Sequence, residues 1–187
     1  MLRLTFIKVT SLLLLSGVAS AGGNELYINQ IGDYTVIQIQ QQGQNNIAHS
    51  DSLGNNNTSI ISQTGTGNFA ESVIAGPNNT VSILQDNNDK SAYVVSQPGK
   101  TGNTVAVDQT GTGSHKATVS VYSDNNSIKI NQTGNTQNET SVLFSADSTG
   151  PSDFTLNQAG SNVYGNAGYV TQTCMNPSGC TVIIDQQ

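Results

Sequence analysis

The chain has 187 residues, of which only 10% are charged and none is tryptophan, and its formal net charge at neutral pH is −6. An acidic chain with few, dispersed lysines lacks the clustered cations that binding to nucleic acid or to an anionic membrane surface requires, so neither is expected as a partner. A composition rich in Asn, Gln, Ser, Thr and Gly fits either a disordered polar segment or a repeat protein, and periodicity distinguishes the two.

Residues 1–21 have the layout of a secretory signal peptide. Arg3 and Lys8 form a short basic region, an apolar stretch covers residues 9–18, and small residues lie at Ala19 and Ala21. The apolar stretch is too short for a stable membrane span, and no later stretch is long and apolar enough to insert into a membrane. We predict cleavage after Ala21, with Ala19 as the alternative, and export of residues 22–187. The competing interpretation is a buried N-terminal helix.

From residue 24 onward the chain consists of short alternating runs. The first run places apolar Leu26 and Ile28 at every second position and ends with Gln30 and Gly32. Alternation of this kind over about five to seven residues predicts strands with one buried face. The same Gln-x-Gly ending recurs with its glutamine at Gln41, Gln63, Gln97, Gln109, Gln132 and Gln158.

Two kinds of run alternate along the chain. The first kind has the frame Asn-x-apolar-x-apolar-x-Gln, as in residues 103–109, and looser runs such as residues 46–54 lie between its copies. Runs of the first kind start at residues 35, 57, 79, 103, 126 and 152, which gives a two-run repeat. Gly and Asn between the runs supply the positive φ angles of tight turns and interrupt any helical periodicity. The pattern therefore predicts an all-β chain.

Equivalent positions of successive repeats carry like residues, which favours a β-solenoid over a sandwich or a barrel. In a solenoid each strand lies about 4.8 Å from its own copy, so like side chains stack and buried amides can form ladders. We predict one domain, residues 22–187, folded as a β-solenoid of about seven two-strand rungs. The predicted inward columns that carry assembly are glutamine (Gln30, Gln41, Gln63, Gln85, Gln109, Gln132, Gln158, Gln186), aliphatic (Ile39, Ile61, Ile83, Val107, Ile130, Leu156, Ile184) and asparagine (Asn57, Asn79, Asn103, Asn126).

The only two cysteines, Cys174 and Cys180, flank a short turn-like segment near the C-terminus. An even cysteine count in an exported chain suggests a disulfide, here a single staple at one end. A metal-binding or redox pair is disfavoured, because no histidine lies nearby and the spacing is not Cys-x-x-Cys.

Both ends of the predicted solenoid lack a recognisable cap. The first run begins at residue 24 and the last run, residues 180–186, stops one residue before the end of the sequence. Uncapped end strands present unpaired backbone groups, and a head-to-tail contact between such ends propagates into a filament. The sequence therefore predicts self-assembly as the function.

The repeats resemble those of the curlin family, the subunits of curli, which are the amyloid fibres of bacterial biofilms. The shared pattern is Asn/Ser-x-apolar-x-Ile-x-Gln-x-Gly-x-x-Asn-x-Ala, and it extends over nearly all of residues 24–187. By this resemblance Asn57, Ile61, Gln63 and their equivalents carry assembly. The resemblance also implies nucleated polymerisation at the cell surface, a companion curlin subunit, an outer-membrane curli secretion channel with accessory factors, and a role in adhesion and biofilm matrix.

Three features depart from the family pattern. The second strand of most repeats lacks the glutamine, with Ser52, Ile74, Val121 and Phe144 in its place, although Gln97 and Gln172 keep it. A long glycine-rich leader is absent, which leaves open how the secretion machinery recognises the chain. The cysteine pair and the longer turns near residues 149–151 and 161–165 are additions, so the choice between a major and a nucleating subunit also stays open.

No sequence motif typical of catalysis occurs. The chain has no Gly-x-Ser-x-Gly, no His-Glu-x-x-His and no phosphate-binding loop, and its acidic residues are dispersed. We expect the isolated His49 and His115 to be surface residues rather than metal ligands, and we predict a non-enzymatic protein without a cofactor. The main alternative to a fibre subunit is a soluble, secreted β-solenoid adhesin or glycan-binding module that does not polymerise. An ice-binding solenoid or an outer-membrane barrel fits the runs less well.

Overall fold

The computed structural model describes residues 3–6, 22–160 and 167–186, and it is a β-solenoid built from two parallel sheets. In these ranges every regular element is a strand, which confirms the predicted all-β solenoid. The described residues include no helix that could cross a membrane. The predicted cleavage site after Ala21 lies outside the described ranges.

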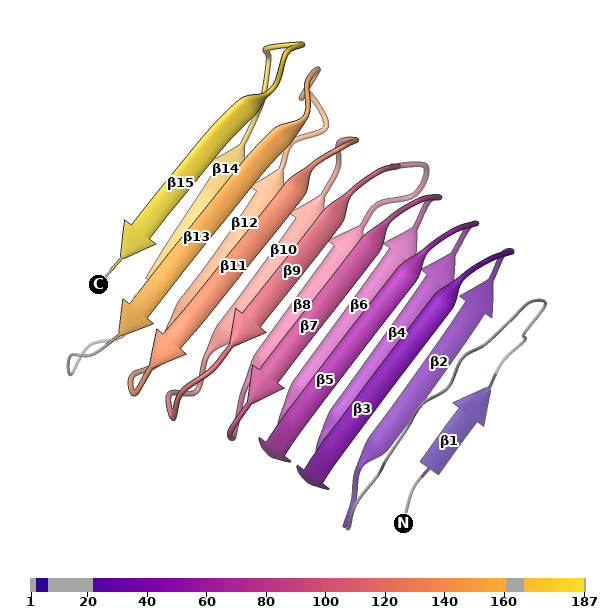
Figure 1. Ribbon diagram of the computed structural model, residues 1–187, viewed down its shortest axis with the longest axis vertical. Helices are drawn as coiled ribbons and strands as arrows, with labels where there is room; N and C mark the ends of the chain where they lie inside the picture. Colours follow the sequence, from indigo (N-terminus) through magenta and orange to yellow (C-terminus); the bar gives the residue numbers. More distant parts are fainter. Residues whose placement is uncertain (1–2, 7–21, 161–166, 187) are drawn as a thin grey trace.

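From β2 onward, successive strands alternate between the two sheets, and their order in space follows the sequence (Figure 1). Each pair of successive strands, such as β2 with β3, makes one rung. One sheet contains β2 (Glu25–Ile31), β4 (Ile47–Leu53), β6 (Phe69–Ala75), β8 (Ser91–Ser96), β10 (Lys116–Val121), β12 (Glu139–Phe144) and β14 (Ala167–Gln172). The other contains β3 (Val36–Gln44), β5 (Thr58–Thr66), β7 (Thr80–Asp86), β9 (Thr104–Gln109), β11 (Ser127–Gly134), β13 (Ser152–Gly160) and β15 (Cys180–Gln186). We call these the even and the odd sheet.

Each strand pairs in parallel with the equivalent strand of the next rung, and the register follows the sequence repeat. In the odd sheet Ile39 lies opposite Ile61, and Gln41 lies opposite Gln63. The separation of equivalent glutamines grows from 22 residues in the first rungs to 28 in the last, yet the register is kept. Insertions are therefore absorbed by the turns, because a one-residue slip in a strand would turn its whole buried face outward.

The core is a narrow layer between the inward faces of the two sheets. Along β5 buried Ser59, Ile61 and Gln63 alternate with more exposed neighbours, as a period of two requires. Phe144 of β12 and Phe154 of β13 meet edge to face across the layer, with ring centroids 5.6 Å apart. Apolar burial thus alternates with polar ladders in the same interior.

Tight corners join the strands, and one of them shows why glycine recurs there. Gly43 has φ of 111°, and a Cβ atom at this position would overlap the carbonyl group of Gly65 in the next rung. Glycine is the residue that tolerates both the positive φ and the close approach of the backbone. The Gln-x-Gly ending is therefore a corner requirement of the stacked rungs.

The two ends of the stack differ. At the N-terminal end β1 (Arg3–Phe6) pairs in parallel with β2, over Glu25 to Ile28. Beyond β3, β14 and β15 the described residues place no further strand. Cleavage after Ala21, as predicted from the sequence, would remove β1 and leave both strands of the first rung with open edges.

Candidate functional site

A ladder of glutamine side chains runs along the inside of the odd sheet. Each Nε2 donates to the Oε1 of the glutamine in the next rung at 2.8–2.9 Å, from Gln41 through to Gln186. These glutamines are buried in every rung but the last, where Gln186 is half-buried. The predicted glutamine column is thus a continuous chain of side-chain hydrogen bonds. Its members are Gln41, Gln63, Gln85, Gln109, Gln132, Gln158 and Gln186.

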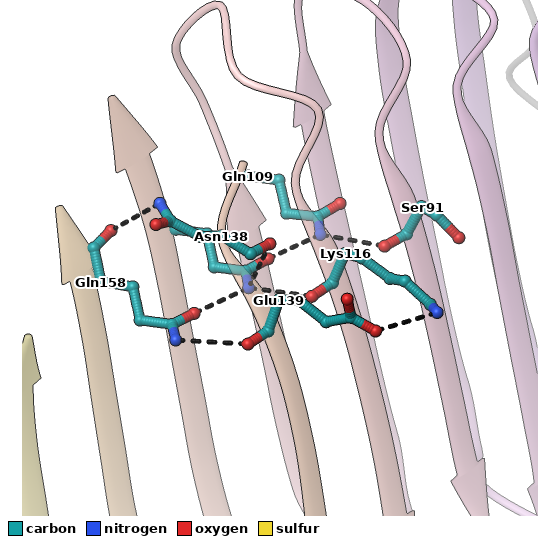
Figure 2. Close-up of polar contacts among 7 residues, drawn as sticks. Ser91, Gln109, Lys116, Asn138, Glu139 and Gln158 are labelled. Atoms are coloured by element: carbon teal, nitrogen blue, oxygen red, sulfur yellow. Dashed lines mark hydrogen bonds and ion pairs between the residues drawn. The ribbon is translucent and has the colours of Figure 1, made fainter. Parts of the chain in front are cut away.

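From Gln41 to Gln158, each ladder amide also donates a hydrogen bond to a backbone carbonyl of the opposite sheet. Gln85 Nε2 donates to the Phe69 carbonyl at 2.8 Å, and Gln109 Nε2 donates to the Ser91 carbonyl at 2.9 Å. Figure 2 shows the same arrangement around Gln109 and Gln158, whose amides reach toward backbone carbonyls of the even sheet. The ladder therefore ties neighbouring rungs together and also ties the two sheets together, and its buried donors find partners.

The ladder has a direction. Every Nε2 points toward the C-terminal end of the stack and every Oε1 points toward the N-terminal end. Within the described residues Gln41 Oε1 receives no hydrogen bond and Gln186 Nε2 donates none. One end of the solenoid thus presents an acceptor and the other presents a donor, in the same column.

The aliphatic and asparagine columns take the places predicted for them. Ile39 to Leu156 are buried beside the glutamines, and Ile184 is partly buried in the last rung. In the asparagine column each Oδ1 accepts the backbone N–H of the next rung, as from Asn79 to Asn57 at 3.0 Å and from Asn126 to Asn103 at 2.9 Å. These side chains replace the backbone partners that a sharp corner leaves unmatched.

A second corner column, opposite the first, was not among the predicted assembly residues. The backbone N–H of Asn46 donates to Asn24 Oδ1 at 2.9 Å, and that of Asn68 donates to Asn46 Oδ1 at 3.1 Å. The recurring asparagine at the start of the looser runs was the available signal. Lys90 and His115 then interrupt the asparagine identity, and Asn138 resumes it.

Lys90 fills an asparagine position with its side chain 1% exposed. Its Nζ donates to the carbonyls of Gly111 at 2.8 Å and Gly113 at 3.0 Å. Burial lowers the pKa of Lys90, and the carboxylates of Asp86 and Asp89 oppose that shift. An ammonium group cannot accept a hydrogen bond, so the Lys90 side chain cannot accept the backbone N–H of the next rung as an asparagine Oδ1 does. The backbone N–H of His115 donates to the Gly113 carbonyl instead.

The prediction that His115 is a surface residue is wrong, since its side chain is 1% exposed. Its Nε2 lies 2.7 Å from the Thr110 carbonyl, and its Nδ1 lies 3.3 Å from the backbone nitrogen of Asn138. A carbonyl only accepts and a backbone N–H only donates, so the ring is neutral with its proton on Nε2 and mimics an asparagine amide. Burial lowers the pKa of His115, hydrogen bonds to backbone carbonyls oppose this shift, and the charge of Lys90 lowers the pKa further.

Gln30 is buried as predicted but lies outside the glutamine ladder. It belongs to β2 of the even sheet, and its neighbour in the next rung is Ser52. In the part of the chain that the structure describes, neither polar atom of its amide has a hydrogen-bond partner. Gln97 also departs from expectation, because Ser96 takes the inward position opposite Ile74 and Gln97 begins the following turn.

Cys174 and Cys180 form a disulfide, with a Cα–Cα distance of 5.8 Å. The bridge joins the turn after β14 to the start of β15. The Cys174 carbonyl also accepts the Thr149 N–H at 2.7 Å, so the bridged turn rests on the turn of the rung before. The disulfide therefore fixes the last rung, which is one end of the stack.

His49 lies on the outer face of the even sheet near the N-terminal end. Its Nε2 lies 3.4 Å from Asp51 Oδ2 and its Nδ1 lies 3.3 Å from Glu71 Oε1. The ring of Tyr27 packs edge-on against the imidazole, with 4.4 Å between the ring centroids. Tyr27, His49 and Glu71 line an open depression together with Phe69, whereas Asp51 lies outside its lining. Among the described residues no group of His, Cys, Asp and Glu side chains has an arrangement that could hold a metal ion.

At the ends of the described solenoid, β3, β14 and β15 each have one edge that pairs with no other described strand, and β1 covers part of the corresponding edge of β2. No protein-family model, curated protein or solved structure matches the chain.

Proposed function

We propose that residues 22–187 form a secreted structural subunit of an extracellular amyloid fibre of the curli type. The subunits would polymerise head to tail, with the last rung of one stacking on the first rung of the next. The fibre would serve adhesion and the biofilm matrix at the bacterial cell surface. The observation that carries this proposal is the directional glutamine ladder, which among the described residues leaves an unmatched acceptor at Gln41 and an unmatched donor at Gln186.

The backbone supports the same conclusion. After removal of residues 1–21, no other described strand would cover the outer edges of β2 and β3 at one end or of β14 and β15 at the other. Soluble proteins block such edges with caps, charges or bulges, because an open edge pairs with other strands. Here the stacking rule inside the subunit, parallel and in register, can continue across the junction without change.

The resemblance of the repeats to curlins adds the cellular setting. It favours export through the periplasm and an outer-membrane secretion channel with accessory factors, and a companion curlin subunit that shares the fibre. The excess of acidic residues and the absence of arginine in residues 22–187 fit a surface that does not bind polyanions.

The second candidate is a soluble β-solenoid adhesin that stays monomeric. The depression beside Tyr27, His49 and Glu71 favours it, because an aromatic ring and carboxylates at a hollow are groups that bind small polar ligands. This candidate needs no contact between the ends of two chains.

Polymerisation of residues 22–187 distinguishes the two candidates. The chain would be diluted from denaturant, and soluble monomer would be followed by sedimentation with and without sheared fibre seeds. The fibre proposal expects loss of monomer without a lag when seeds are added. A folded chain that remains monomeric for days, with or without aggregates from an earlier preparation, contradicts the proposal and leaves the adhesin.

A further inference from the structure

The first strand of the described even sheet after β1 holds a buried amide without a hydrogen-bond partner among the described residues. In the uncleaved chain Gln30 is 1% exposed, and neither its Nε2 nor its Oε1 forms a hydrogen bond with a described residue; the same holds for the hydroxyl of neighbouring Ser52. An amide that is buried without a partner is costly, so a strand that stacks on β2 and offers Gln30 a hydrogen-bond partner is favoured over one that does not. Such a partner would lie beyond the first rung, since β1 pairs only with residues up to Ile28.

The same column ends in a second glutamine. From Gln30 it passes through one inward residue in each rung and reaches Gln172 of β14, which pairs with Phe144. Gln172 is half-buried, and its amide makes no hydrogen bond within the described residues. The even sheet thus has one amide without a partner at each end. The residues between them are Ser52, Ile74, Ser96, Val121 and Phe144.

A neighbouring inward column shows complementary sizes at its ends. It starts with Leu26, continues with Ala48 and further alanines, passes Thr140 and ends with Gly168. Leu26 is its largest residue and, at 7%, the most exposed of the core. A Cβ atom on Gly168 would only touch Gln158 and Gln186 at 3.8 Å, so the last rung leaves space where the first rung has bulk.

We infer that each end of the solenoid fits the opposite end of a second copy of this chain, in one polarity and one register. β14 of one copy lies on β2 of the next and β15 lies on β3. Gly168 then faces Leu26, and two amide pairs form, Gln172 with Gln30 and Gln186 with Gln41. The inference rests on the proposed fibre function and specifies the partner of its ends.

Opposite polarity is disfavoured by the same groups. Two N-terminal ends brought together would set β2 antiparallel to β2 and β3 antiparallel to β3, so the inward columns of one copy would not continue into those of the other, and both copies would present the Gln41 acceptor without a matching donor. The edge of β2 accepts a parallel strand, since β1 occupies part of it in the uncleaved chain. The mature junction places β14 where β1 lies, so removal of residues 1–21 has to precede stacking.

The predicted contact between Leu26 of one copy and Gly168 of the next can be tested on residues 22–187. This segment contains the whole apolar core, which runs from Leu26 to Ile184, and it lacks only β1 of the described strands. Gly168→Val introduces a β-branched residue of the size of Thr140, which the same column already holds in the preceding rung. Gly168→Ala is the control, because Leu26 lies on Ala48 within the subunit.

Growth of sheared wild-type seeds would be measured with each monomer, after circular dichroism and hydrogen exchange have established that the monomers fold alike. Overpacking at the junction predicts that Gly168→Val elongates at least about tenfold more slowly than wild type, while Gly168→Ala stays within about twofold. The double variant Leu26→Ala/Gly168→Val returns elongation to within about threefold of wild type. On single fibres, substoichiometric Gly168→Val stops growth at one end only.

Three results would overturn the inference. The first is an equal elongation rate for Gly168→Val and Gly168→Ala. The second is a double variant Leu26→Ala/Gly168→Val that folds but elongates as slowly as Gly168→Val. The third is that Gly168→Val stops growth at both ends of a fibre. If Gly168→Val fails to fold, Gln172→Ala replaces it, because this amide makes no hydrogen bond within the described subunit and its loss slows elongation only through Gln30 of the next copy. Wild type that does not grow on seeds refutes the fibre proposal and the inference together, whereas normal wild-type growth with unaffected variants refutes the inference alone.

Discussion

Truncating one glutamine inside the ladder tests whether the buried amides hold the rungs together. In Gln85→Ala three hydrogen bonds disappear: the donation to Gln109 Oε1 at 2.9 Å, the donation to the Phe69 carbonyl at 2.8 Å, and the acceptance from Gln63 Nε2 at 2.9 Å. The remaining amides of Gln63 and Gln109 keep one unpaired donor and one unpaired acceptor in a dry interior. The change therefore perturbs the rung on either side of the substituted one.

The magnitude follows from those two orphaned groups. Each buried polar group without a partner costs about 1–3 kcal/mol. Since neighbouring side chains can relax partly into the space left by the amide, we expect a loss of about 3 kcal/mol in the free energy of unfolding. The matched control is Gln40→Ala, which removes the same side chain from the exposed face of β3 and is expected to change stability by less than about 0.5 kcal/mol.

Urea unfolding of residues 22–187 at low concentration, before fibres form, measures both values. The midpoint should fall for Gln85→Ala at an unchanged slope, since the slope reports the surface exposed on unfolding. Equal midpoints for the two variants would refute the reasoning, because they would mean that the ladder amides contribute no more than exposed ones.

Three further changes test other parts of the fold. Because the pKa of His115 is lowered in the folded state, the contribution of its neutral ring to stability is complete above the ordinary histidine pKa of about 6.5 and is lost as the pH falls below that value. Urea midpoints should therefore be lower at mildly acidic than at neutral pH. The variant His115→Asn, whose amide donates and accepts without titrating, should make the midpoint less dependent on pH. Gly43→Ala should destabilise by about 2 kcal/mol more than Gly99→Ala, since both have positive φ but only the first has backbone in the way of a Cβ; equal urea midpoints would contradict the close stacking of corners. The double variant Cys174→Ser/Cys180→Ser should lose about 2 kcal/mol or less, confined to the last rung; hydrogen exchange should show lower protection in β14 and β15 with β5 unchanged, and uniform loss would count against a local staple.

The register of the odd sheet could be predicted because every repeat signals it in the same way. Ile61 and Gln63 recur two residues apart in successive rungs, and a period of two with a fixed repeat length allows one stacked arrangement. The direction of the ladder could not be predicted. It depends on how each amide is oriented by carbonyls of the even sheet, which are remote in sequence.

The even sheet was less predictable because its inward positions vary. Ser52, Ile74 and Phe144 occupy one column, so no residue identity marks the register, and the Gln-x-Gly motif at Gln97 suggested a position one residue too late. His115 was misjudged for a related reason. Its ring imitates an asparagine amide through two hydrogen bonds, and this equivalence is visible only when the corner is seen in three dimensions.

Fibre diffraction from aligned fibres of residues 22–187 tests the central claim most directly. Coaxial stacking of rungs across subunits predicts a sharp meridional reflection near 4.8 Å, because the strand spacing continues through every junction along the fibre axis. A fibre whose 4.8 Å reflection lies on the equator, or a chain that yields no fibres, would contradict the account, since the solenoids would then associate side by side or not at all.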